Sequence, residues 1–313
     1  MTYSIVARDP ETGDFGVAVQ SHWFAAGLVC WAESGVGAVA TQATVLIDHG
    51  PLALDLMREG RSAPEALELR LAADEDREHR QVATLDGRGR VAAHTGERCI
   101  PEAGHRAGEG YSCQANMMRR ATVWDAMAET FEAAPGELAD RFLAALDAAE
   151  AEGGDIRGRQ AARILVVRAT PTEKPWEDVL VDLRVDDHPE PLPELRRLLD
   201  LKRAYDHEER AEELSLAGDA EAAAAESEAA FALAPGNPEL SFWTAVRMAV
   251  QHGMVEQARP ILRFALEADP GWAQLLRRLG ERRLSEVTPQ LAERLLADAG
   301  GETSPGRRAD ADG

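Results

Sequence analysis

The residues with the clearest chemical potential stand at the start of the chain, where Thr2 and Ser4 follow the first methionine. Because an initiator methionine is removed when the second residue is small, we expect the mature chain to begin at Thr2. The free α-amine of Thr2 would then lie beside its own hydroxyl, which places a nucleophile and its base in one residue. An α-amine has an ordinary pKa of about 8, close enough to neutral pH for general-base catalysis. Thr2 and Ser4 are therefore candidate catalytic residues, and the alternative is that Thr2 only ends an edge strand.

The segment GGDIRGRQ, residues 153–160, holds the densest group of polar side chains. Its two glycines can turn the chain off a preceding helix, and Asp155, Arg157 and Gln160 follow before an apolar run. Asp155 is a candidate catalytic residue that would stabilise a charged amine. Arg157 and Gln160 are candidate substrate-binding residues, and Arg157 suits a carboxylate. A structural ion pair between Asp155 and Arg157 is the alternative.

Other polar residues recur at the ends of apolar, strand-like runs. Strand ends that meet at one rim commonly form a binding site, whereas each residue alone also suits an ordinary hydrogen bond. The candidate substrate-binding residues in such positions are His22, Gln42, Thr95 and Asn116, and Gln20, Ser21, Thr41, His94 and Gln114 stand beside them.

The elements that must position these residues are mostly short strands. Alternating or apolar runs predict strands over 3–7, 15–20, 110–118 and 176–187, a hairpin over 80–96, two strands within 26–45 and one in the run AARILVVRA. Helical patterns cover 51–60, 62–74 and 122–152, the last of them broken near Pro135 and Gly136. Strands and helices occur in blocks instead of alternating singly. This order favours an α+β fold in which stacked antiparallel sheets are covered by helices.

From residue 192 onward the chain is rich in Ala, Glu and Leu and is helical throughout. Gly218, Glu221, Ala223 and the pair Pro235-Gly236 recur 35 positions later. The period and pattern resemble tetratricopeptide-like repeats, with about two units present, and a plain helical hairpin is the alternative. We expect one domain over 1–200, a tetratricopeptide-like helical domain over 201–299 and a disordered tail over 300–313.

Charge and cysteine content exclude several classes of protein. The formal net charge of −21 argues against nucleic acid or an anionic membrane as a partner. No leader segment and no apolar run of membrane-spanning length is found, and the three cysteines do not suit a disulfide framework, so a cytoplasmic location is expected. Cys99, His105 and Cys113 lack the paired spacing of a zinc site, and no nucleotide-binding motif is present. We therefore expect no metal and no cofactor.

Several segments, taken in order, resemble those of a known family. TYSIVARDPETGDFGVAVQS, GVGAVATQA, HTGERCI, QANMM and GGDIRGRQ are similar to the conserved segments of the bacterial DUF1028 family, over about residues 2–200. That family is assigned to the N-terminal nucleophile (Ntn) hydrolase superfamily. The resemblance implies a four-layer αββα sandwich and amide-bond hydrolysis by an N-terminal nucleophile, with Thr2 and Ser4 at the matching positions.

Two positions depart from the family pattern. Ala161 stands where a serine usually follows Gly-Arg-Gln, so a hydroxyl is lost there. The sequence Asp48-His49-Gly50-Pro51 stands where the family usually has Tyr-Gly-Pro. We therefore expect substrate recognition to differ from that of relatives.

The expected function is hydrolysis of a small amide substrate by Thr2 or Ser4. Backbone N–H groups, with Asn116 or Gln42, would stabilise the oxyanion. The alternative is a binding module that keeps the cleft without the chemistry and holds a small metabolite. The helical region, over about 205–295, is expected to dock a protein partner or to form a homodimer contact.

Overall fold

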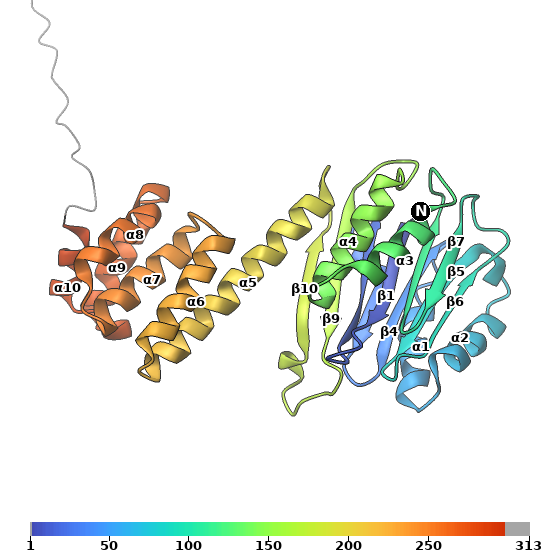
Figure 1. Ribbon diagram of the computed structural model, residues 1–313, viewed down its shortest axis with the longest axis horizontal. Helices are drawn as coiled ribbons and strands as arrows, with labels where there is room; N and C mark the ends of the chain where they lie inside the picture. Colours follow the sequence, from blue (N-terminus) through green and yellow to red (C-terminus); the bar gives the residue numbers. More distant parts are fainter. Residues whose placement is uncertain (1, 298–313) are drawn as a thin grey trace, which may run out of the picture. The chain divides into compact units, whose positions relative to one another are not determined.

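The computed structural model describes residues 2–297, which form two antiparallel sheets, covering helices and a helical region (Figure 1). Met1 and the predicted tail over 300–313 lie outside the described residues. The described chain divides into two compact units between Leu198 and Leu199. The predicted α+β class is confirmed.

The larger sheet has the strand order β10-β9-β2-β1-β8-β7. Its strands are β1 (Thr2–Arg8), β2 (Phe15–Ser21), β7 (Gly104–Gly108), β8 (Tyr111–Asn116), β9 (Ala161–Val167) and β10 (Val179–Val185). β1 is central, because it pairs with β2 on one side and with β8 on the other. Thr2 lies opposite both Ser21 and Asn116. The alternative that Thr2 ends an edge strand is therefore wrong.

The smaller sheet has the order β3-β4-β5-β6. Its strands are β3 (Cys30–Glu33), β4 (Gly37–Ala43), β5 (Arg80–Asp86) and β6 (Val91–Thr95). Successive side chains of a strand point to opposite faces. Ala38 and Leu85 therefore contribute to a core shared with Val17 of the larger sheet, whereas Val39 and Val82 pack on the other face against helices.

Two helix pairs cover the outer faces of the sheets. α1 (His49–Arg58) and α2 (Ala63–Ala72) pack on the smaller sheet, and α3 (Val123–Ala133) and α4 (Leu138–Ala151) pack on the larger one (Figure 1). Ser62 and Glu65 form a reciprocal capping box that fixes the start of α2. Short 3-10 turns occupy Ala26–Val29, Arg77–His79, Pro175–Glu177 and Leu284–Glu286.

The strand β7 is absent from the sequence-based prediction. Its sequence, GHRAG, has no apolar run, and at this edge of the larger sheet none of its residues is fully buried. With β7 in place, the first unit consists of strand hairpins separated by the two helix pairs.

The second unit is helical, as predicted for this part of the chain. The helices of this region are α5 (Pro191–Leu216), α6 (Ala220–Leu233), α7 (Pro238–Gln251), α8 (Val255–Ala268), α9 (Gly271–Arg282) and α10 (Pro289–Leu296). Gly218 and Gly253, which recur 35 positions apart in the sequence, have φ of 87° and 67° in the turns of two successive helical hairpins. Among the described helices, none combines the length and the apolar character needed to cross a membrane.

Candidate functional site

A group of buried polar side chains lies between the two sheets, at one end of an otherwise apolar core. Their position follows from strand alternation, because Thr2 and Ser4 lie on the same face of β1 as Val6, which is part of the core between the sheets. The same alternation brings in residues from other strands. The buried polar residues on these facing surfaces are Thr2, Ser4, Ser21, Gln42, Gln81, Ser112, Gln114 and Asn116.

Thr2 is held through both its hydroxyl and its backbone. Its Oγ1 donates a hydrogen bond to Oγ of Ser21 at 3.0 Å. Its carbonyl oxygen accepts from Nε2 of Gln42 at 3.3 Å and from Nδ2 of Asn116 at 3.4 Å. These three partners belong to three different strands, which together fix the position of Thr2. The residue is only 4% exposed. The structure thus brings together the predicted residues Thr2, Gln42 and Asn116.

Gln81 connects this buried group to Thr95 at the end of β6. It was not among the predicted site residues. Its Oε1 accepts from Gln42 at 2.6 Å and from Asn116 at 2.9 Å. Its Nε2 donates to Oγ1 of Thr95 at 2.8 Å and to the carbonyl oxygens of Gly104 and Ala115. The available signal was a glutamine on the inward face of an apolar strand.

Ser4 lies deeper between the sheets and is fully buried. Its hydroxyl donates to Oε1 of Gln42 at 2.8 Å and accepts from Nε2 of Gln114 at 2.6 Å. Both roles of the hydroxyl are therefore used inside the protein.

Asp155 lies beside the end of β2, with a fully buried carboxylate. The carboxylate accepts from the backbone N–H of His22 at 3.2 Å and from the backbone N–H of Arg157 at 2.9 Å. It also forms an ion pair with the Arg157 guanidinium at 3.1 Å. Because His22 follows Ser21 directly, Asp155 is joined to Thr2 through this strand end. The predicted residues His22, Asp155 and Arg157 therefore lie together.

Two glycines turn the chain from α4 toward Asp155. Gly153 and Gly154 have φ of 109° and 58°. A Cβ atom on Gly154 would lie 2.5 Å from Oε1 of Glu150, whose carboxylate accepts from the Tyr3 hydroxyl and from Arg159. The two glycines therefore fix the path of the chain into Asp155, because a larger residue would be strained at these dihedral angles and would displace Glu150.

Gln160 is the predicted residue that the structure places apart from these contacts. Its Nε2 donates to Oδ1 of Asp187 at 3.1 Å, and its carbonyl oxygen accepts from the backbone N–H of His188. Both partners belong to the segment after β10, away from the hydrogen bonds of Thr2 and Asp155.

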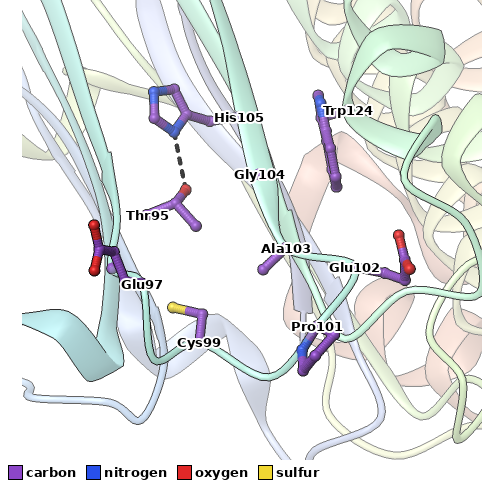
Figure 2. Close-up of a pocket in the computed structure, with 10 residues that line it drawn as sticks. Thr95, Glu97, Cys99, Pro101, Glu102, Ala103, Gly104, His105 and Trp124 are labelled. Atoms are coloured by element: carbon purple, nitrogen blue, oxygen red, sulfur yellow. Dashed lines mark hydrogen bonds between the residues drawn. The ribbon is translucent and has the colours of Figure 1, made fainter.

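Thr95 leads from Gln81 to a cavity of about 560 Å³ (Figure 2). The Thr95 hydroxyl accepts from Gln81, so its own hydrogen is available to Nδ1 of His105, 2.9 Å away. Partial burial of the ring, followed by the nearby His94, lowers the pKa of His105. The lowered pKa favours the neutral ring, in which Nδ1 accepts from Thr95.

A metal site is not formed by the cysteines and histidines considered above. Cys99 and His105 line the cavity, whereas Cys113 is fully buried in β8. Within residues 2–297, no group of three or more His, Cys, Asp or Glu side chains is arranged to hold a metal ion.

Fold and site together define an α+β protein whose two sheets enclose a polar site around the first residue of a central strand. The model of the family of unknown function DUF1028 matches residues 2–195. The chain therefore belongs to the DUF1028 family.

A solved structure supports the same assignment. The crystal structure of protein SPO2555 from Silicibacter pomeroyi, also described as DUF1028, is 32% identical in sequence with a TM-score of 0.57. The match covers 63% of this chain and 87% of that chain. A comparison with curated proteins finds no match.

Proposed function

We propose that the protein is an Ntn-type hydrolase that cleaves a small amide with the Thr2 hydroxyl as nucleophile. One observation carries this proposal: Thr2 is fixed at the end of a central strand by hydrogen bonds from both sheets, and the buried carboxylate of Asp155 accepts from His22, the residue after its partner Ser21. Helix pairs on the outer faces of two stacked sheets are also the arrangement expected of the αββα sandwich. Fold analogy alone is a weak basis for activity, so the proposal depends on the site.

The reaction requires that Thr2 carries a free α-amine after removal of Met1. The amine takes the proton from Oγ1 as this oxygen attacks the amide carbonyl carbon. The tetrahedral intermediate then collapses, the C–N bond breaks, and the leaving amine receives that proton. Water hydrolyses the resulting ester by the same route, which restores the Thr2 hydroxyl and releases a carboxylic acid.

The contacts suggest different roles for the two side-chain amides near Thr2. Nε2 of Gln42 has three acceptors, namely Gln81 and the carbonyl oxygens of Thr2 and Gln114. We therefore assign Gln42 to positioning Thr2. Asn116 is the better oxyanion donor, because its 3.4 Å bond to the carbonyl of Thr2 is the longest in the group and the easiest to exchange.

Asp155 and Arg157 have complementary roles in this proposal. The Asp155 carboxylate stabilises the protonated α-amine through its position beside the end of β2. The Arg157 side chain, which is 33% exposed, is accessible to a substrate carboxylate.

Thr2 is favoured over Ser4 as the nucleophile. Ser4 would become the first residue only after cleavage behind Tyr3, and its hydroxyl already has two partners. Tyr3 is fully buried and its hydroxyl donates to Glu150, so its removal would open a hole under α4.

Intact mass spectrometry and a matched pair of variants test the proposal. We expect the mature chain to lack Met1 and to release product from a panel of small amides. Thr2→Ala should abolish turnover, whereas Thr2→Ser should retain part of it. A mature chain that keeps Met1, or full turnover by Thr2→Ala, would contradict the mechanism.

A second candidate function is binding of a small metabolite without catalysis. The observation that favours it is the burial of Thr2 and Ser4, whose hydroxyls are both engaged within the protein. Thermal-shift screening separates the two functions. A ligand that stabilises wild type and Thr2→Ala equally, with no turnover, favours binding.

The helical region keeps its proposed role as a tetratricopeptide-like docking surface or homodimer contact. The two hairpins that repeat at a 35-residue spacing support it. Light scattering on the full chain and on a chain ending near residue 203 tests the dimer contact, because an unchanged oligomeric state after truncation would contradict it. A cytoplasmic location is supported by the free thiols of Cys30, Cys99 and Cys113.

A further inference from the structure

The cavity beside Thr95 opens where the edge strands of the two sheets meet. β6 supplies Thr95, β7 supplies Gly104 and His105, and α3 contributes Trp124 (Figure 2). The cavity is a separate space from the surroundings of the Thr2 hydroxyl, although Gln81 contacts both its wall and the residues that hold Thr2. Its volume of about 560 Å³ suits a small molecule.

The cavity lining is acidic and aromatic. Glu97 and Glu102 both line it, and the lining residues include no lysine or arginine. Figure 2 shows Glu102 on the same side as Trp124 and Glu97 on the opposite side. A positively charged ligand therefore meets carboxylates and an indole ring, and no lining residue carries a fixed positive charge.

The position of Trp124 depends on the absence of a side chain on β7. A Cβ atom at Gly104 would lie 2.5 Å from Cζ2 of Trp124. The indole therefore lies directly against the backbone of β7, at the wall of the cavity (Figure 2).

Glu102 has an unusual backbone conformation for a glutamate. Its φ is 55°, in the left-handed region that favours glycine. Its carbonyl oxygen accepts from the backbone N–H of Met118 at 3.1 Å, which fixes this loop against the end of β8. Strained positions of this kind cluster at binding sites, where the surroundings determine them.

We propose that this cavity binds a small alkylammonium ligand, with the cationic group between the Glu102 carboxylate and the Trp124 ring. A cation is attracted to the face of an indole and forms a charge-assisted contact with a carboxylate. The imidazole of His105 accepts from Thr95, and in its neutral form it adds no positive charge that would repel the ligand. This site goes beyond the proposed hydrolysis, because binding needs no chemistry at Thr2.

Titration with two pairs of probes tests the charge requirement. The first pair is choline and its uncharged isostere, in which carbon replaces nitrogen, and the second is butylammonium and butanol. The readout is the indole N–H signal of Trp124 in the full chain, assigned with Trp124→Phe. We expect at least one of the two cations to shift this signal at concentrations where its neutral partner does not. Equal shifts from a cation and its neutral partner, or no shift from either cation, would overturn the proposal.

Matched variants test the residues. Glu102→Gln should weaken binding of the cation by about tenfold or more, and Trp124→Leu, measured calorimetrically, should do the same. Glu109→Gln and Trp176→Phe are controls, since both residues are exposed and outside the cavity lining. Unchanged affinity in Glu102→Gln and Trp124→Leu would overturn the assignment.

The same titration on Thr2→Ala separates this site from the proposed function. We expect cation binding to remain unchanged when hydrolysis is abolished. Binding without turnover in wild type would reject the hydrolase and keep the site, whereas turnover without any cation binding would reject the site alone.

Discussion

Gln42 donates from the smaller sheet to the carbonyl oxygen of Thr2 in the larger sheet, across 3.3 Å. The first residue of β1 is thus positioned by a side chain of the opposite sheet. Ser4, two residues further along β1, donates to the same glutamine. The same hydrogen bonds therefore link the two sheets and fix the geometry at Thr2.

Replacing Gln81 should be among the most destabilising polar substitutions in the first unit. In Gln81→Met, the buried amides of Gln42 and Asn116 lose their shortest acceptor and keep only bonds of 3.3–3.4 Å, and the carbonyl oxygens of Gly104 and Ala115 lose a donor. An unsatisfied buried group costs about 1–3 kcal/mol, so we expect a loss of about 3 kcal/mol or more in the free energy of unfolding. Urea denaturation followed by circular dichroism measures it.

The matched control is Gln160→Met, which removes one hydrogen bond at the surface. Its cost should stay within about 0.5 kcal/mol. Similar losses for the two variants would mean that the buried network contributes little.

Gly154→Ala should destabilise the protein more than Gly110→Ala. Both glycines have positive φ, of 58° and 73°. A Cβ at position 154 would displace Glu150 from Tyr3, whereas a Cβ at position 110 has no neighbour closer than 3.9 Å. We expect an additional cost of about 1 kcal/mol for Gly154→Ala in thermal unfolding. Equal costs would show that the glycine is needed only for its dihedral angles.

Stability should fall as the pH decreases from about 7 to 5, in part because of His49. Burial lowers the pKa of this fully buried imidazole, an effect that outweighs the opposing influence of Asp74, 2.9 Å from Nε2. Below about pH 6.5 the unfolded chain therefore binds a proton that the folded chain resists, so the free energy of unfolding decreases. A proton added to Nδ1 of His49 would have no hydrogen-bond acceptor, because this buried atom has no partner.

Urea denaturation at a series of pH values between 5 and 7 measures this effect. His49→Gln should show a shallower dependence than wild type. Part of the slope should remain, since the pKa of His105 is also lowered. An identical slope in the variant would exclude His49 as a source.

The buried ion pair of Glu208 and Arg247 should stabilise the helical unit. The two side chains are 2.6 Å apart and about nine-tenths buried, and Thr244 also donates to Glu208. Glu208→Ala leaves the guanidinium without this partner and should cost about 3 kcal/mol. The double variant Glu208→Met, Arg247→Met should recover most of this loss, as measured by thermal unfolding. A double variant no more stable than the single one would contradict this account.

Local patterns in the sequence were sufficient to predict most of the fold. Strand alternation and the blocks of strands and helices predicted the α+β class. Gly153 and Gly154 were expected to turn the chain, and they do so with positive φ. The edge strand β7 was not predicted, because an edge strand of small and polar residues has no apolar period to detect.

The candidate site was predicted only in part, because its contacts are non-local. Thr2 and Asn116 were identified as polar residues at strand ends, and the register places them opposite each other. Gln81 became visible only when β5 and β8 faced one another across the core. Arg157 and Asp155 do form the ion pair considered as an alternative, and their proximity to Thr2 depends on the pairing of β2 with β9.

The strand order of the larger sheet has a consequence for how the nascent chain folds. The hairpin of β1 and β2 is synthesised first, yet β8 pairs on one side of it and β9 on the other. Both edges of this hairpin must therefore wait for segments about a hundred residues or more away, and contacts between such distant segments form slowly. Asp155 lies six residues before β9, the first strand of the last hairpin, so its contact with His22 can form only when most of the first unit has been made. The environment of Thr2 is thus completed at the end of assembly, and an incomplete chain cannot contain the finished site.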